Sequence, residues 1–142
     1  MTILILNGPN LNMLGKRDPT IYGSETLSDI EHYIQETFPE YTFEFFQSNV
    51  EGELVDQIQQ STQRNIDGIV ANFGAYTHTS IALRDALEHV SIPKVEVHIS
   101  NIHAREEFRK ESLTGEVMNG IITGFGRESY ILGIKAVELI TN

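Results

Sequence analysis

Five short apolar runs recur along the chain, separated by longer segments whose apolar residues are spaced three and four positions apart. Short apolar runs are typical of buried strands, and the longer spacing predicts amphipathic helices. The predicted strands are Thr2–Leu6, Thr42–Gln47, Gly68–Asn72, Lys94–Ile99 and Gly120–Phe125. The predicted helices are Leu27–Phe38, Gly52–Arg64, Ser80–Val90 and Glu128–Ile140. Thr26 and Asp29 fit a capping box at the start of the first helix.

Strands that alternate with helices in this way indicate a parallel sheet with helices against both faces. We therefore expect an α/β fold, a flavodoxin-like, doubly wound, five-stranded parallel sheet. The chain is expected to form a single domain over residues 1–142. In such folds ligands bind outside the carboxyl ends of the strands.

Composition limits the classes of function. The chain has 142 residues, a hydrophobic fraction of 40% and no cysteine, so disulfides and a thiolate nucleophile are excluded. A formal net charge of −10 argues against nucleic acid and anionic membranes as partners. No segment reads as a signal peptide or approaches the length of a membrane span, and a cytoplasmic location is expected.

The connection after the first strand, residues 8 to about 24, is long for a strand-to-helix link. Connections of this length are usually functional loops or disordered segments, and we expect a lid. It carries the polar residues Asn10, Arg17 and Tyr22. Tyr22 has two interpretations, a surface aromatic or a base whose phenolate is favoured by the nearby Arg17.

The most informative stretch lies at the fourth predicted strand and the residues that follow it. Val95, Val97 and Ile99 share one face by the two-residue strand period, whereas Glu96, His98 and Ser100 share the other. A carboxylate two positions before a histidine can orient the imidazole. His98 is therefore either a general acid or a buried histidine satisfied by Glu96. Arg105 and Arg109, four positions apart, are expected on one side of a helical turn.

Polar residues also follow the third predicted strand. Asn72 ends it, and His78 and Asp85, seven positions apart, are expected on one helical face that binds hydroxyl groups. The exits of the first, third and fourth strands are expected to converge on one crevice that binds an oxyanionic small molecule. A metal site built from His78, Asp85, Glu96 and His98 is disfavoured, because no short ligand pair such as HExxH is present.

Other motifs are missing. The first loop, NGPNLNMLG, matches neither GxxxxGK[ST] nor GxGxxG, and no GxSxG elbow occurs. These absences disfavour nucleotide binding and acyl transfer. A non-catalytic flavodoxin-like binding or receiver module is the alternative function. Such a module should carry a flavin or phosphate loop, or acidic residues at the exit of the first strand, where this chain has Asn7 and Asn10.

Three motifs together resemble the type II 3-dehydroquinate dehydratases: NGPNLNMLGKRDPTIYG, NFGAYTHTSIALRDAL and VEVHISNIHAREEFR. The resemblance runs from Ile3 to Arg109 and more loosely through Gly120–Gly126. It implies a flavodoxin-like subunit assembled as trimers within a homododecamer. It also implies the reversible loss of water from 3-dehydroquinate to 3-dehydroshikimate, in the shikimate route of aromatic amino acid biosynthesis or in quinate breakdown, without metal or organic cofactor.

The resemblance also implies roles for individual residues. Tyr22 would accept the C2 proton with the help of Arg17, Asn10 would hold a water against the enolate oxygen, and His98 would donate a proton to the departing C1 hydroxyl. Glu96 and Arg105 would support these residues. The substrate would be held by Asn72, by the backbone at Ile99 and Ser100, and by His78, Asp85 and Arg109.

The chain departs from the family pattern at three places. Phe73 stands where proline is common, which is expected to loosen the turn after the third strand. Lys110 and Glu111 stand where two histidines are frequent, and Asp18 replaces a frequent glutamate.

Overall fold

The computed structural model describes residues 1–16 and 23–141. Its strands are β1 (Thr2–Asn7), β2 (Thr42–Gln47), β3 (Gly68–Asn72), β4 (Lys94–His98) and β5 (Gly120–Thr123). Its α-helices are α2 (Leu27–Thr37), α3 (Glu51–Ser61), α4 (Ile81–Glu88) and α5 (Glu128–Thr141). The predicted elements are all present, and the predicted capping box of Thr26 and Asp29 is formed at the start of α2.

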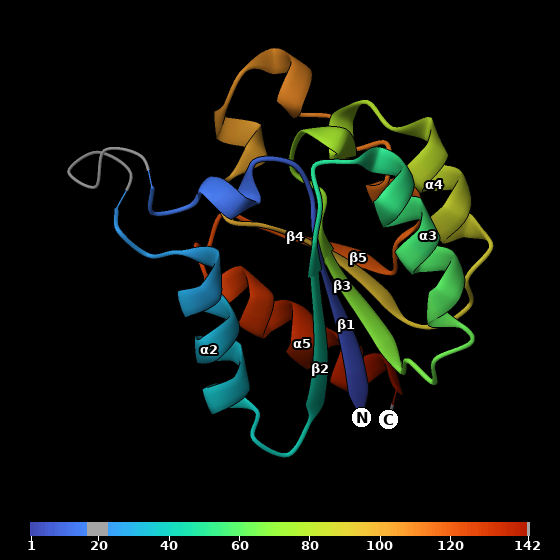
Figure 1. The fold of residues 1–142 in the computed structure, drawn as a ribbon. Helices are drawn as coiled ribbons and strands as arrows, with labels where there is room; N and C mark the ends of the chain where they lie inside the picture. The colour runs from blue at the N-terminus through green and yellow to red at the C-terminus, as the bar shows by residue number, and fades with distance from the viewer. Residues whose placement is uncertain (17–22, 142) are drawn as a thin grey trace.

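The five strands form one parallel sheet in the order β2-β1-β3-β4-β5. Helices cover both faces, with α2 and α5 on one side and α3 and α4 on the other (Figure 1). The predicted flavodoxin-like, doubly wound sheet is therefore confirmed.

Two apolar cores lie against the two faces of the sheet, because successive strand residues point to opposite sides. Leu4, Leu6 and Ala71 pack with the inner residues of α3 and α4. Ile5 and Val97 pack with the inner residues of α2 and α5. Near-continuous apolar strands are thus buried on both sides, as a covered parallel sheet requires.

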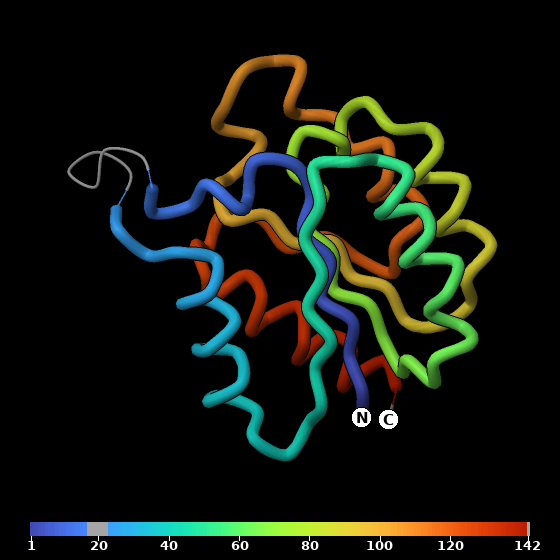
Figure 2. The backbone as a smooth tube through the Cα atoms, viewed as in Figure 1, coloured from blue at the N-terminus to red at the C-terminus, as the bar shows by residue number. Residues whose placement is uncertain are grey.

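After β1 the chain adds β2 on one side of β1, and β3 then follows on the opposite side of β1. The order in which strands are added therefore reverses direction between β1 and β3. The strand register places Gln47, Asn7 and Asn72 in one row at the carboxyl ends of β2, β1 and β3. The connections that follow the strands gather at this end of the sheet, and both termini lie at the opposite end (Figure 2). A topological reversal of this kind is where open α/β sheets form ligand sites.

Short 3₁₀ turns, not longer helices, follow three of the strands. They are η1 (Leu11–Met13), η2 (Gly74–His78), η3 (Ile102–Ala104), η4 (Glu107–Arg109) and η5 (Gly115–Val117). None of the helices in the described ranges is long and apolar enough to cross a bilayer.

Candidate active site

A cavity of about 850 Å³ opens at the carboxyl ends of β1, β3 and β4, where the sheet reverses its winding. The predicted convergence of these three strand exits is therefore confirmed. The residues that line it are Pro9, Asn10, Leu11, Met13, Leu14, Gly15, Asn72, Gly74, Ala75, His78, His98, Ile99, Ser100, Ile102, Arg105 and Arg109.

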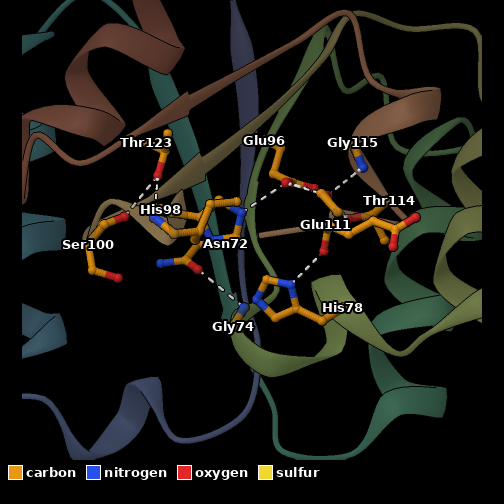
Figure 3. A network of polar contacts seen from close by, with 12 residues as sticks. Asn72, Gly74, His78, Glu96, His98, Ser100, Glu111, Thr114, Gly115 and Thr123 are labelled. Carbon is orange, nitrogen blue, oxygen red and sulfur yellow. Dashed lines mark hydrogen bonds and ion pairs between the residues drawn. The ribbon is translucent and has the colours of Figure 1, made fainter. Parts of the chain in front are cut away.

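Tyr130 links Asn7 and Asn72, the last residues of β1 and β3, by hydrogen bonds. Its hydroxyl donates to Asn7 Oδ1 at 2.6 Å and accepts from Asn72 Nδ2 at 3.0 Å. All three side chains are buried, and burial raises the pKa of the Tyr130 hydroxyl above its ordinary value. Asn72 Oδ1 accepts from the backbone of Gly74 at 3.2 Å (Figure 3). The Asn72 amide is thereby fixed in orientation, and its Nδ2 retains a second hydrogen for a ligand.

The residues that directly follow β1 pack closely against those that directly follow β3. Gly8 N donates to Asn72 O at 2.8 Å, and a Cβ at position 8 would overlap the Phe73 carbonyl. Phe73 itself is fully buried in the core beneath α3 and α4. The expectation that Phe73 loosens this turn stays a prediction, and the structure shows that its side chain packs into the core.

Asn10 sits at the rim with a left-handed backbone (φ 69°). Its backbone N–H donates to Asn49 Oδ1 at 2.9 Å, and Gln47 Nε2 donates to Gly8 O at 3.1 Å. Tyr76 donates its hydroxyl to Asn49 O at 2.6 Å, which holds the residues after β2 in place. The loop that carries Asn10 is thus supported by the exit of β2.

His98 and Glu96 form a buried polar pair in the site. His98 Nε2 lies 2.8 Å from Glu96 Oε2, with the histidine 4% and the glutamate 0% exposed (Figure 3). A carboxylate can only accept, so Nε2 carries the hydrogen and the imidazole is held in one orientation. His98 lines the cavity, whereas Glu96 lies behind it.

His78 lies next to His98, with ring centroids 6.4 Å apart and the ring planes 22° from parallel. Its Nδ1 is 2.7 Å from Glu111 O. The prediction that His78 and Asp85 share one helical face is wrong. His78 ends the 3₁₀ turn η2, α4 begins only at Ile81, and the exposed Asp85 does not line the cavity of this chain.

Arg105 and Arg109 both line the cavity, but not on one helical turn as predicted. Arg105 directly follows η3 and Arg109 ends η4, so the two residues belong to different short turns. Glu106 joins them instead, at 3.7 Å from Arg105 Nε and 3.2 Å from Arg109 Nε. A hydrogen bond from its own backbone and one from Arg109 lower the pKa of the Glu106 carboxyl. The cavity wall thus carries two guanidinium groups that share one carboxylate partner.

The backbone carbonyl groups of Ile99 and Ser100 both accept hydrogen bonds from residues at the end of β5 or after it. Gly126 N donates to Ile99 O at 3.0 Å, and Thr123 Oγ1 donates to Ser100 O at 2.9 Å. Both residues line the cavity. The residues at the end of β5 and after it therefore hold the turn whose backbone is expected to bind the substrate.

Arg17 and Tyr22 belong to residues 17–22 of the predicted lid over residues 8–24, and these six positions lie outside the described residues. Within residues 1–16 and 23–141, no group of three or more His, Asp or Glu side chains is arranged so that it could bind a metal ion.

Sequence reasoning missed several residues that shape the site. Gln47 and Asn49 lie at the end of a predicted strand, so the argument applied to the other strand exits was available for them. Tyr130 carried a weaker signal, because a buried tyrosine needs a partner for its hydroxyl. The partners of Glu96 described below, Ser112 and Thr114, left no recognisable pattern.

Comparison with known proteins agrees with this geometry. The family model "Dehydroquinase class II" matches residues 1–138. A 3-dehydroquinate dehydratase of Pelodictyon phaeoclathratiforme is 53% identical over 100% of this chain and 95% of its own length. The corresponding Fusobacterium nucleatum protein is 54% identical over 94% of each chain. The crystal structure of a type II dehydroquinase from Butyrivibrio crossotus superimposes with a TM-score of 0.92 at 49% identity, covering 97% of both chains. The chain therefore belongs to the class II dehydroquinase family.

Proposed function

We propose that this chain is a 3-dehydroquinate dehydratase, a hydro-lyase that converts 3-dehydroquinate to 3-dehydroshikimate in the shikimate route or in quinate breakdown. Its family membership supports this activity over a non-catalytic binding module. The observation that carries the proposal is His98, backed by the buried Glu96, in the wall of a cavity that also holds Arg105 and Arg109.

The proposed chemistry is an elimination. A base removes the proton at C2, which is acidic because the C3 ketone can take up the charge as an enolate. The C1–O bond then breaks, and the departing hydroxide takes a proton and leaves as water. The electron pair ends in a C1–C2 double bond conjugated with the ketone. Two separate proton-transfer groups are needed, one as base and one as acid.

We assign the acid to His98, oriented by Glu96 and supported by Arg105. We assign the base to Tyr22 and the stabilisation of its phenolate and of the transition state to Arg17, two residues outside the described ranges. Asn10 is proposed to hold a water against the enolate oxygen. Preorganised donors of this kind act most strongly where water is excluded.

For substrate binding, we propose that Asn72 and the backbone of Ile99 and Ser100 hold the carboxylate. His78, Asp85 and Arg109 are proposed to engage the ring hydroxyls. The described geometry supports these roles for all but Asp85, which lies outside the cavity of its own chain.

At a coarser scale, we propose that residues 1–142 act as one catalytic domain in the cytoplasm, without cofactor, and that twelve copies assemble as four trimers. Apolar side chains on the surface of the single chain support the assembly, since Ile81, Phe108, Phe125 and Leu139 are each more than 60% exposed.

The proposal is tested by following enone absorbance after adding 3-dehydroquinate to purified protein without added metal. We expect turnover in the wild type and, in His98→Asn, a loss of kcat of about 10²- to 10⁴-fold, as for removal of a general acid. The exposed His32 on α2 provides the control His32→Asn, which should retain wild-type kcat. Absence of turnover in the wild type refutes the activity, and a defect of His98→Asn confined to KM refutes the acid role.

A further inference from the structure

The segment Glu111–Thr114, between η4 and η5, has no role in the reaction as proposed, yet it is bonded to two walls of the cavity. Glu111 O contacts His78 Nδ1 at 2.7 Å, and Leu113 N donates to Thr77 O at 2.9 Å, so the segment is fastened to η2. Figure 3 shows it running from His78 to Glu96, and thus beside both histidines of the site.

The side chains of this segment converge on one carboxylate. Ser112 Oγ donates to Glu96 Oε2 at 2.8 Å, the same oxygen that accepts from His98 Nε2. Thr114 Oγ1 donates to the other oxygen, Oε1. Thr114 and Glu96 are both fully buried. Each oxygen of the carboxylate therefore has its own hydroxyl donor in a place that water does not reach.

The direction of the Ser112 hydrogen bond is fixed by a further contact. Gly115 N donates to Ser112 Oγ at 2.8 Å, which occupies the oxygen as an acceptor and leaves its hydrogen for Glu96. The carboxylate thus receives three hydrogen bonds, two from hydroxyls and one from the imidazole.

Such an arrangement has a consequence for His98. A buried carboxylate with an unbonded oxygen is costly and would rotate or draw in another donor. Rotation of Glu96 would move the acceptor away from His98 Nε2 and release the imidazole from its single orientation. We propose that Ser112 and Thr114 are positioning residues, which hold the Glu96 carboxylate and, through it, the ring of His98. This inference rests on the proposed function for its catalytic consequence only.

The variant Thr114→Val tests it, because valine keeps the shape of threonine and replaces the hydroxyl by a methyl group that cannot donate. We expect kcat to fall by about 10- to 100-fold, less than on removal of the acid itself, with KM changed less than about threefold. Thr114→Ser, which restores a hydroxyl, should recover most of the lost kcat. Ser112→Ala should show the same direction, and it carries the test if Thr114→Val does not fold.

Ser61→Ala is the matched control. Ser61 is also fully buried, and its hydroxyl donates to Ile58 O at 2.6 Å within α3, away from the cavity. This variant loses a buried hydroxyl bond of the same kind and should keep wild-type kcat. A general loss of rigidity would lower kcat in both variants, whereas a positioning role lowers it only in the variants of Ser112 and Thr114.

A second measurement does not depend on turnover. The ring ¹⁵N signals of His98, identified by their absence in His98→Asn, should report a hydrogen on Nε2 in the wild type and a mixture of tautomers in Thr114→Val. Wild-type kcat in Thr114→Val, or a defect confined to KM, overturns the inference. If the wild type does not turn over 3-dehydroquinate, the proposed function fails, and an unchanged ring spectrum in Thr114→Val then overturns the positioning role by itself.

Discussion

At the scale of single residues, the site depends on polar side chains that are buried and held by hydrogen bonds within the protein. Glu96, Asn72 and Tyr130 are buried, and each makes at least two such hydrogen bonds. Buried polar groups of this kind are costly to leave unpaired, so a satisfied network fixes side-chain orientation strongly. The ligand-facing groups of the cavity are thereby preorganised before any ligand binds.

The variant Tyr130→Phe tests this network by removing only the hydroxyl that bridges Asn7 and Asn72. The variant leaves Asn7 Oδ1 and Asn72 Nδ2 without their shared partner, and we expect a loss of about 1–3 kcal/mol in unfolding free energy. Urea unfolding measures it. A loss below about 0.5 kcal/mol would contradict the bridge, since that is the range of neutral surface substitutions.

The difference in unfolding free energy between the wild type and Tyr130→Phe is also expected to depend on pH. Burial raises the pKa of Tyr130 in the folded protein, so the unfolded chain loses this proton first as the pH rises. The stabilisation is present below the ordinary tyrosine pKa of about 10 and declines above it. We expect the stability difference between wild type and Tyr130→Phe to be constant up to about pH 9 and to shrink toward about pH 11. The other tyrosines are common to both proteins and cancel.

At the scale of elements, close packing of two strand exits positions the cavity. The loop after β1 lies directly on the turn after β3, because Gly8 has no side chain and Phe73 is drawn into the core. The exit of β2 supports the same loop through Asn49. The placement of Asn10 and Asn72 relative to each other therefore depends on contacts between neighbouring connections.

Gly8→Ala tests this contact. A Cβ at position 8 meets the Phe73 carbonyl, a backbone atom that cannot rotate away. We expect a cost of about 1–3 kcal/mol in unfolding free energy together with a lower kcat/KM. Gly52→Ala in α3 is the control, because a Cβ there meets nothing within 4 Å and alanine favours the helix. Equal stability of the two variants would show that the strand exits do not pack as described.

At the scale of the whole molecule, the single chain leaves features that a further copy would explain. Large apolar side chains remain exposed, and β5 is an edge strand that pairs only with β4. Asp85, expected in the site, is exposed and does not line the cavity of its own chain. These features support the proposed assembly of several copies.

The assembly is tested by light scattering of the purified protein. Twelve chains of 16.0 kDa give a particle of about 190 kDa, which we expect across a range of protein concentrations. A particle with the mass of one chain would contradict the proposed dodecamer, and a mass of three chains would leave only the trimer.

The sequence by itself determined the fold and the main polar residues of the cavity wall. Two periods, two residues for strands and three to four for helices, located every strand and every α-helix of the described residues, because burial on both faces of a parallel sheet leaves that pattern in the chain. The rule that ligands bind at the carboxyl ends of strands then brought Asn72, His98, Arg105 and Arg109 to one place.

Only the tertiary structure decided which atoms meet. The bridge from Tyr130 to Asn7 and Asn72, and the hydroxyls of Ser112 and Thr114 on Glu96, join residues from 16 to 123 positions apart. The separation of His78 from Asp85 likewise depends on where a 3₁₀ turn stops and a helix begins. Periodicity records which face of an element is buried, but it carries no information about the partner of a buried polar atom. That choice is made by packing among elements that are distant in sequence.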